Sequence, residues 1–262
     1  MHFDFAIAFA GLLIGTIVGI TGVGGGALMT PTLVMVFGVP PGIAVGTDLL
    51  YASATQLLGT AVHQRHGTVD WQVVGRLAMG SLPAAAATLW WMHASGHGNI
   101  QGGVIMFALG IALGITALGM IFKEKLHSFG TRLRVTDGEH FKSMQAGLTV
   151  ASGVLLGVMV TLTSVGAGAI GTVLLVYLYP LRLTAGRLVG TGMAHAIPLT
   201  LIAGLGHLSL GDVDLSLMAT LLAGSIPGVL VGSTISAKAP VKLVQRSIAG
   251  ALLFASIRML VR

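Results

Sequence analysis

The sequence predicts an all-α, polytopic membrane protein made of two related halves, and three observations lead to that fold class. Apolar residues make up 54% of the 262 residues and charged residues only 8%, against a usual charged share of about 25%. Many apolar stretches approach the roughly 20 residues that a helix needs to cross a bilayer core. A long part of the first half also returns in the second half, which is typical of transporters built from internal repeats.

The internal repeat starts at a glycine-rich turn. Residues 21–30, TGVGGGALMT, return at 163–172 as TSVGAGAIGT. After a slip of two residues, 45–83 aligns without gaps with 189–227 and is identical at 13 of 39 positions. Transporters with such repeats bind their substrate where the halves meet, so we look for a site between the two copies.

Five apolar segments are expected in each half. They lie at 4–20, 27–38, 43–63, 71–92 and 100–122, and again at 144–161, 169–180, 184–206, 213–235 and 240–261. The second segment of each half is short, because about twelve residues of helix span about 18 Å, less than the roughly 30 Å hydrocarbon core. Each short segment either spans the bilayer or re-enters it as a hairpin with the preceding helix. The prediction is therefore about eight spans plus two short broken or re-entrant segments.

The halves are expected at 1–122 and 143–262, joined by a polar linker loop at 123–142. Basic residues set the orientation of membrane proteins, so we place the basic linker in the cytoplasm. The same side then receives the turns that carry Arg65 and Arg182. Because five elements precede the linker, the second half enters from the opposite face, and we expect an inverted repeat.

Several function classes receive no support from the composition. The chain has no cysteine, so it has no disulfide and no thiol chemistry. Its basic residues gather in a few loops, which suits a membrane protein better than a nucleic-acid binder. No protease or hydrolase motif and no acid cluster is present, so we expect no enzyme, no metal and no cofactor. The expected partners are the lipid bilayer and a small anion, with the oligomeric state left unassigned.

The two glycine-rich turns are candidate anion sites. A glycine run breaks an apolar helix, and its bare amides must be buried in protein or face a wet cavity. The helices that begin at Ala27 and Ala169 would each present free N–H groups and a positive dipole end. The alternative is tight helix packing through glycine. The candidate substrate-binding residues in the turns are Gly22, Gly24, Gly25, Gly26, Gly166 and Gly168.

Side chains of the next helix in each half extend this candidate site. Thr47 and Thr191 occupy matching positions, and their hydroxyls either serve a ligand or bond back to their own helix. Tyr51 and His195 match one turn later and can line the same cavity as hydrogen-bond donors. For His195, a packing role in the helix bundle is the alternative.

Asp48 is the acid that lies well inside an apolar segment, and its counterpart in the repeat is Gly192. A carboxylate in a membrane interior is costly and is a functional candidate by default, so we consider Asp48 for proton coupling. The alternative is that it lies near the outer interface or caps the helix start. Asp70 and Asp214 stand before later segments, where we expect helix caps rather than metal ligands.

The chain resembles the TauE/SafE family of sulfite-exporter-like anion transporters. The resemblance is carried by the glycine run 22–26 through Pro31, by residues 44–47, by the second copy at 164–191 and by 80–83. It implies a multi-pass carrier of the inner (plasma) membrane for a small sulfur-containing or organic anion such as sulfite, sulfoacetate or thiosulfate. The second copy departs from the first, with Ala167 in place of Gly25.

These observations favour a secondary membrane transporter that exports a small anion by alternating access around the two turns. A passive anion channel would use the same backbone sites without saturation or counterflow. A membrane subunit that anchors a partner complex is the remaining alternative.

Overall fold

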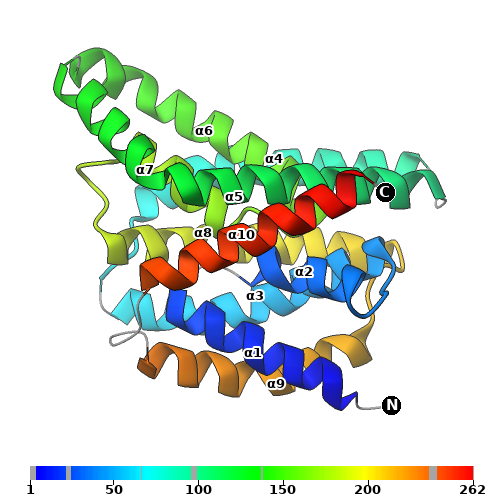
Figure 1. Ribbon diagram of the computed structural model, residues 1–262. Coiled ribbons are helices and arrows are strands. Elements are labelled where there is room, and N and C mark those ends of the chain that lie inside the picture. The colour runs from blue at the N-terminus through cyan, green and yellow to red at the C-terminus, as the bar shows by residue number, and fades with distance from the viewer. Residues whose placement is uncertain are drawn as a thin grey trace.

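The structure is a computed structural model that describes residues 4–21, 25–65, 67–95, 99–136, 138–235 and 241–261. In these ranges the chain forms ten α-helices (Figure 1). Each of the ten predicted apolar segments coincides with one helix, which confirms the all-helical prediction. The helices are α1 (Phe5–Thr21), α2 (Gly26–Met35), α3 (Pro41–Arg65), α4 (Trp71–Ala94), α5 (Asn99–Thr136), α6 (Gly138–Thr163), α7 (Ala169–Leu178), α8 (Ala185–Ser209), α9 (Leu215–Ile235) and α10 (Val241–Leu260).

The helices differ in length as the sequence predicts. The second helix of each half, α2 or α7, has 10 residues, and such a helix is about 15 Å long. In the described part of the chain, four stretches are long and apolar enough to cross a membrane. They are Gly103–Arg132, Met144–Thr163, Ala185–Ser209 and Leu215–Gly232. The number of eight spans therefore stays a prediction.

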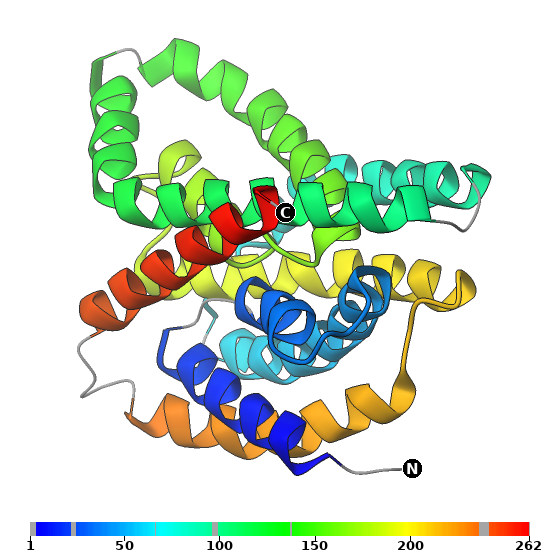
Figure 2. The same cartoon turned by 45° about the vertical axis from the view of Figure 1, so that its right-hand side comes forward.

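Residues 123–142 were expected to form a loop, but most of them are helical. Helix α5 continues to Thr136 and α6 begins at Gly138. Lysine, glutamate, arginine and leucine are good helix formers, so a polar composition alone does not end a helix. The end of α5 and the start of α6 project as a hairpin from the upper left of the molecule (Figures 1 and 2).

The fourth helix of each half packs against the first helix of the other half. Helix α9 lies along α1 at the bottom of both views, and α4 lies along α6 (Figures 1 and 2). Helices α3 and α8 pair with each other, as do α5 and α10. Each helix of the first half corresponds to the helix five places later in the second half. Replacing every helix by its counterpart turns the pair α1 with α9 into α6 with α4, and leaves the pairs α3 with α8 and α5 with α10 unchanged. The repeat in the sequence is therefore also a repeat of helix contacts.

Glycines allow the exchanged helices to approach closely. A Cβ at Gly80 would collide with the carbonyl oxygen of Val150, and one at Gly224 would collide with that of Ala8. The facing glycines are Gly153 and Gly157 in α6 and Gly11 and Gly15 in α1. Small residues let membrane helices make backbone contact, and here they do so at matching positions of both halves.

The molecule has two apolar cores, and each contains helices of both halves. One contains Leu77 of α4 together with Leu156 of α6 and Leu199 of α8. The other contains Ile14 of α1 together with Leu221 of α9. Each core thus combines helices from both halves, and the halves interlock rather than stand side by side.

Candidate functional site

The glycine-rich turns of the two halves touch each other. A Cβ at Gly26, the first residue of α2, would collide with the backbone oxygen of Ser164 and lie 3.0 Å from its Oγ. Ser164 follows the end of α6 and opens the second turn. Gly22 and Gly24 lie outside the described residues, so the contact is seen through Gly25, Gly26 and the second turn.

The second turn contains backbone conformations that favour glycine. Ser164 has a φ of 58° and Gly166 a φ of 119°. Left-handed backbone costs a residue with a side chain roughly 1–2 kcal/mol. The counterpart of Ser164 in the first half is Gly22. The serine therefore holds a conformation that its repeat partner can adopt without this cost, and such strain often marks functional sites.

The helices that start at the turns carry no side-chain caps. The residues that precede them, Gly25 before α2 and Gly168 before α7, make no capping hydrogen bond through a side chain. The first N–H groups of a helix have no partner within the helix, and they favour an anion. In this conformation Ser164, Val165 and Ala167 are buried. A solute would reach the second turn only after neighbouring helices have moved.

Tyr51 lies against the first turn. A Cβ at Gly25 would lie 3.4 Å from Cε1 and 3.8 Å from the hydroxyl oxygen of Tyr51. The tyrosine is itself buried. The structure therefore places Tyr51 where sequence analysis expects it, beside the glycine-rich turn, while its role toward a ligand stays a prediction.

Asp48 lies at the junction of the two turns. It is 0% exposed, and its Oδ2 accepts a 2.6 Å hydrogen bond from Thr30 Oγ1 in α2. Its Oδ1 has no hydrogen-bond partner among the described residues. The Ser164 hydroxyl lies close to the carboxylate but outside hydrogen-bond geometry. Asp48 therefore lies inside the helix bundle, seven residues after the start of α3, and its part in proton coupling stays a prediction.

Thr47 and Thr191 tie α3 to α8 through a reciprocal pair of hydrogen bonds. The backbone N–H of Asp214 donates to Thr47 Oγ1, and that of Asp70 donates to Thr191 Oγ1, each at 3.0 Å. Each threonine lies near the start of its helix and each aspartate follows the end of the other helix. The two helices are therefore antiparallel. The hydroxyls are engaged in joining the halves, a role that the sequence analysis did not consider.

Tyr51 and His195 face matching serines of the fourth helices. His195 is 1% exposed, and its Nε2 lies 2.8 Å from Ser81 Oγ in α4. The counterpart of Ser81 is Ser225 in α9, whose hydroxyl lies near Tyr51 without a hydrogen-bond partner in the described chain. His195 thus has a hydrogen-bond partner inside the helix bundle. The matching residues of the other pair, Tyr51 and Ser225, lie near each other without such a hydrogen bond.

Asp70 and Asp214 cap helices, as predicted. Asp70 Oδ1 accepts from the N–H of Val73 at 3.3 Å. Asp214 Oδ1 accepts from the N–H groups of Ser216 and Leu217 at 2.8 and 2.9 Å. Among the described residues, no group of three or more metal-ligating side chains gathers at one place.

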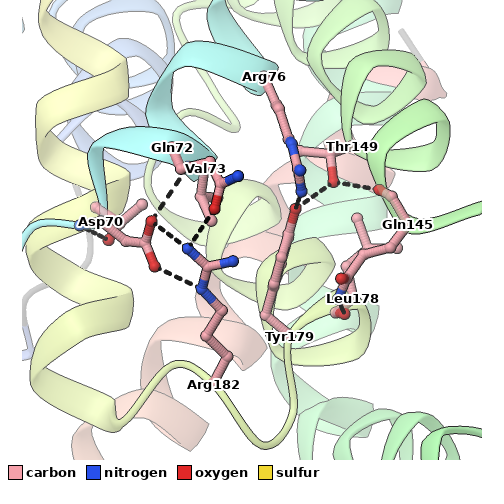
Figure 3. Close-up of polar contacts among 10 residues, drawn as sticks. Asp70, Gln72, Val73, Arg76, Gln145, Thr149, Leu178, Tyr179 and Arg182 are labelled. Carbon is pink, nitrogen blue, oxygen red and sulfur yellow. Dashed lines mark hydrogen bonds and ion pairs between the residues drawn. The ribbon is translucent and has the colours of Figure 1, made fainter. Parts of the chain in front are cut away.

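Sequence reasoning missed a polar cluster around Asp70 (Figure 3). Arg182 binds the Asp70 carboxylate through Nε at 2.7 Å and through a terminal nitrogen at 2.9 Å. It also donates to Gln72 at 2.8 Å. The partners are 112 residues apart, so no local pattern could pair them. They do come from two turns that the sequence analysis placed on the same side of the membrane.

Tyr179 extends this cluster toward the centre of Figure 3. Its hydroxyl accepts from Arg76 at 3.2 Å and lies 2.8 Å from Thr149 Oγ1. The Arg182 guanidinium lies 5.8 Å from the centre of its ring. These contacts join α4 and α6 to the segment between α7 and α8, and they hold the two halves together on this face.

A separate groove of about 560 Å³ lies on the projecting end of α5. It is lined by Phe122, Lys125, Leu126, Ser128, Phe129 and Arg132. These residues belong to one helix, so the groove is not part of the junction between the turns.

Comparison with known proteins places the whole chain in one group. The family model for sulfite exporter TauE/SafE matches residues 7–259. The "Probable membrane transporter protein YjnA" of Bacillus subtilis (strain 168) is 38% identical over 260 residues, 97% of this chain and 99% of the relative. The "Probable membrane transporter protein YdhB" of the same organism is 29% identical, over 84% of this chain and 85% of the relative. No solved structure matches the chain.

Proposed function

Because the chain belongs to the sulfite exporter TauE/SafE family, we propose that it is a secondary transporter of the inner membrane that exports a small anion. The observation that carries the proposal is the contact between the two glycine-rich turns, with Asp48 beside it. The family and the names of the relatives favour transport over catalysis. The substrate class is a small sulfur-containing or organic anion such as sulfite or sulfoacetate.

An inverted repeat, which stays a prediction, would allow a mechanism in which one site opens to each face in turn. Antiparallel α3 and α8, joined by the reciprocal Thr47 and Thr191 bonds, are what inversion of one half requires. The exchanged pairs α1 with α9 and α6 with α4 repeat the same packing in both halves. Two related halves with opposite orientation can exchange conformations, which converts an outward-open state into an inward-open one.

The helix ends at Gly26 and Ala169 are the proposed anion-binding groups. Backbone N–H groups at a helix N-terminus bind oxyanions through hydrogen bonds and through the helix dipole. Tyr51 and His195 add side-chain donors from α3 and α8. Burial of the second turn is what a closed state of such a carrier requires.

Asp48 couples anion movement to a proton in this proposal. An anion next to an ionised, buried carboxylate is repelled by it, and the repulsion is strong where water is excluded. A proton on Asp48 removes the repulsion, so anion and proton share the site. Thr30 is positioned to hold one carboxylate oxygen while Oδ1 takes the proton.

The test uses purified protein in lipid vesicles loaded with radiolabelled sulfite or sulfoacetate. A carrier shows saturable flux, and unlabelled anion on the opposite side accelerates exit of the label. Flux that rises linearly with concentration and lacks counterflow would identify a channel instead. Vesicles that release label no faster than protein-free controls would reject transport of these anions by the isolated chain.

A further inference from the structure

We propose that the groove on the projecting end of α5 binds an anionic phospholipid. Its basic side chains hold the phosphate of the headgroup, and its phenylalanine rings cover part of an acyl chain. The groove lies outside the junction of the glycine-rich turns, so the proposal does not depend on which anion is transported. It concerns a segment that the sequence analysis expected to form a loop.

Helix α5 is longer than one crossing of a bilayer requires. Its 38 residues correspond to about 57 Å, against a hydrocarbon core of roughly 30 Å. The apolar stretch begins at Gly103, and about 20 residues from there, to Phe122, carry the helix across the core. The residues that follow Phe122 therefore lie at the level of the lipid headgroups. In both views this end projects away from the other helices together with the start of α6 (Figures 1 and 2).

The projecting end of α5 is strongly basic. Residues 123–136 contain two lysines, two arginines and one glutamate, which leaves a net charge of +3 with histidine neutral. The sequence analysis places this segment in the cytoplasm. The cytoplasmic surface of a membrane carries anionic lipids, and basic segments next to a membrane helix are attracted to them. The charge of the segment is therefore complementary to that of the surface it faces.

Basic and aromatic side chains share one face of this helix end. Phe122, Lys125, Phe129 and Arg132 follow one another at spacings of three or four residues, which places them on the same side of a helix. Phe122 is 43% exposed and Phe129 54% exposed, and the two basic side chains are exposed as well. A basic helix with exposed aromatic rings is typical of segments that lie in the membrane interface.

Contacts on this face fix the groove in place. Lys125 Nζ lies 5.5 Å from the centre of the Phe122 ring. The Phe129 ring stacks on that of Tyr177 in α7, with 6.2 Å between the ring centres. A Cβ at Gly130 would collide with the carbonyl oxygen of Tyr177, so the backbones of α5 and α7 touch here. The groove therefore keeps its orientation relative to the helices of the bundle.

A phospholipid uses all the groups that line the groove. Lys125 and Arg132 supply positively charged donors for a phosphate, and the Ser128 hydroxyl lies between them along the helix. A soluble anion would use these donors but leave both phenylalanine rings exposed. A second copy of the chain would bring two segments of like charge together, which is unfavourable. The volume of about 560 Å³ lies within the range of small-molecule sites, about 300–1,000 Å³.

The test locates the lipid and measures its selectivity. The purified full chain in a neutral detergent is mixed with phosphatidylglycerol that carries a photoreactive group on an acyl chain, near the headgroup. After irradiation, mass spectrometry of peptides maps the adduct, and unlabelled phosphatidylglycerol or phosphatidylcholine competes for the site. One double variant, Lys125→Gln with Arg132→Gln, removes two charges from the groove. The matched control, Arg65→Gln with Arg246→Gln, removes two charges from exposed positions of α3 and α10.

We expect adducts within residues 122–132 of the wild type, displaced by phosphatidylglycerol but not by the same concentration of phosphatidylcholine. The groove double variant should bind phosphatidylglycerol about thirtyfold more weakly, which corresponds to about 1 kcal/mol for each basic residue near an anionic surface. The control double variant should be labelled like the wild type. Added salt should weaken labelling of the wild type, because it screens exposed charges.

The proposal is wrong if both lipids compete equally, if the adducts lie mainly outside the groove, or if the groove variant is labelled like the wild type. A groove variant that changes the oligomeric state instead of the labelling would identify the groove as a contact between copies. If the double variant does not fold, Lys125→Gln alone decides the question, with an expected weakening of about fivefold. None of these measurements uses transport, so their outcome is separate from that of the proposed function.

Discussion

At the scale of single residues, Ser164 combines backbone strain with a functional position. Its left-handed φ of 58° lies at the point where the halves touch, and its hydroxyl approaches Asp48. Substitution by glycine relieves the strain, whereas substitution by alanine keeps it, and both remove the hydroxyl. We expect Ser164→Gly to be more stable than Ser164→Ala by about 1 kcal/mol. Thermal unfolding of the two purified variants measures the difference, and equal melting temperatures would show that the backbone here is not strained.

Individual site residues differed in how far sequence alone could predict them. Asp48 stood out because an acid inside an apolar segment is costly, and the structure places it in the interior. Its partner Thr30 lies 18 residues away on another helix, so only the packing of α2 against α3 reveals it. The cross-half bonds of Thr47 and Thr191 were missed for the same reason. A hydroxyl near a helix start has several partners within reach, and the tertiary fold selects among them.

At the scale of helices, the close approach of α4 to α6 depends on Gly80. A Cβ there would meet the Val150 carbonyl oxygen, whereas a Cβ at Gly75 in the same helix meets nothing within 4 Å. We expect Gly80→Ala to destabilise the protein by about 1–3 kcal/mol through overpacking. Gly75→Ala should stabilise it by roughly 0.5–1 kcal/mol, because glycine is unfavourable inside a helix.

The two substitutions are expected to change the free energy of unfolding in opposite directions, so comparing them separates close packing from helix propensity. Both add one methyl group to one helix, so propensity alone predicts that both stabilise. Chemical or thermal unfolding in one detergent, with Gly224→Ala as the repeat of the Gly80 change, gives the three values. Stabilisation by Gly80→Ala would mean that α4 and α6 do not make backbone contact.

Helix positions were predictable to within a few residues, except around the expected linker. Long apolar runs bounded by glycine, proline and charged residues identify membrane helices because the bilayer fixes their length and composition. Residues 123–136 include many charged side chains, and this polar composition indicated a loop. Lysine, glutamate, arginine and leucine nevertheless have a high helix propensity, and the segment is helical. The packing of α4 against α6 and of α9 against α1 had no local signal, because each pair joins segments that are far apart in the sequence.

At the scale of the whole molecule, inversion of the repeat makes a direct prediction for topology. Arg65 at the end of α3 and Ser209 at the end of α8 are matching, exposed positions. The native chain has no cysteine, so a single introduced thiol reports without background. We expect Arg65→Cys to react with a membrane-impermeant maleimide only after cells are opened, and Ser209→Cys to react in intact cells.

Two further thiols serve as controls for that experiment. Ser128→Cys on the projecting end of α5 should behave like Arg65→Cys, and Ser95→Cys after α4 should behave like Ser209→Cys. Reaction of positions 65 and 209 from the same side would exclude an inverted repeat, and with it the exchange of conformations between the halves.

The central claim is that an anion and a proton share the junction of the two glycine-rich turns. Calorimetric titration with sulfoacetate in buffers of different ionisation enthalpy measures how many protons the protein takes up on binding. We predict uptake of about one proton per anion by the wild type, because the bound charge repels an ionised Asp48. Asp48→Asn should bind without uptake. Absence of binding, or equal uptake by both proteins, would contradict the account.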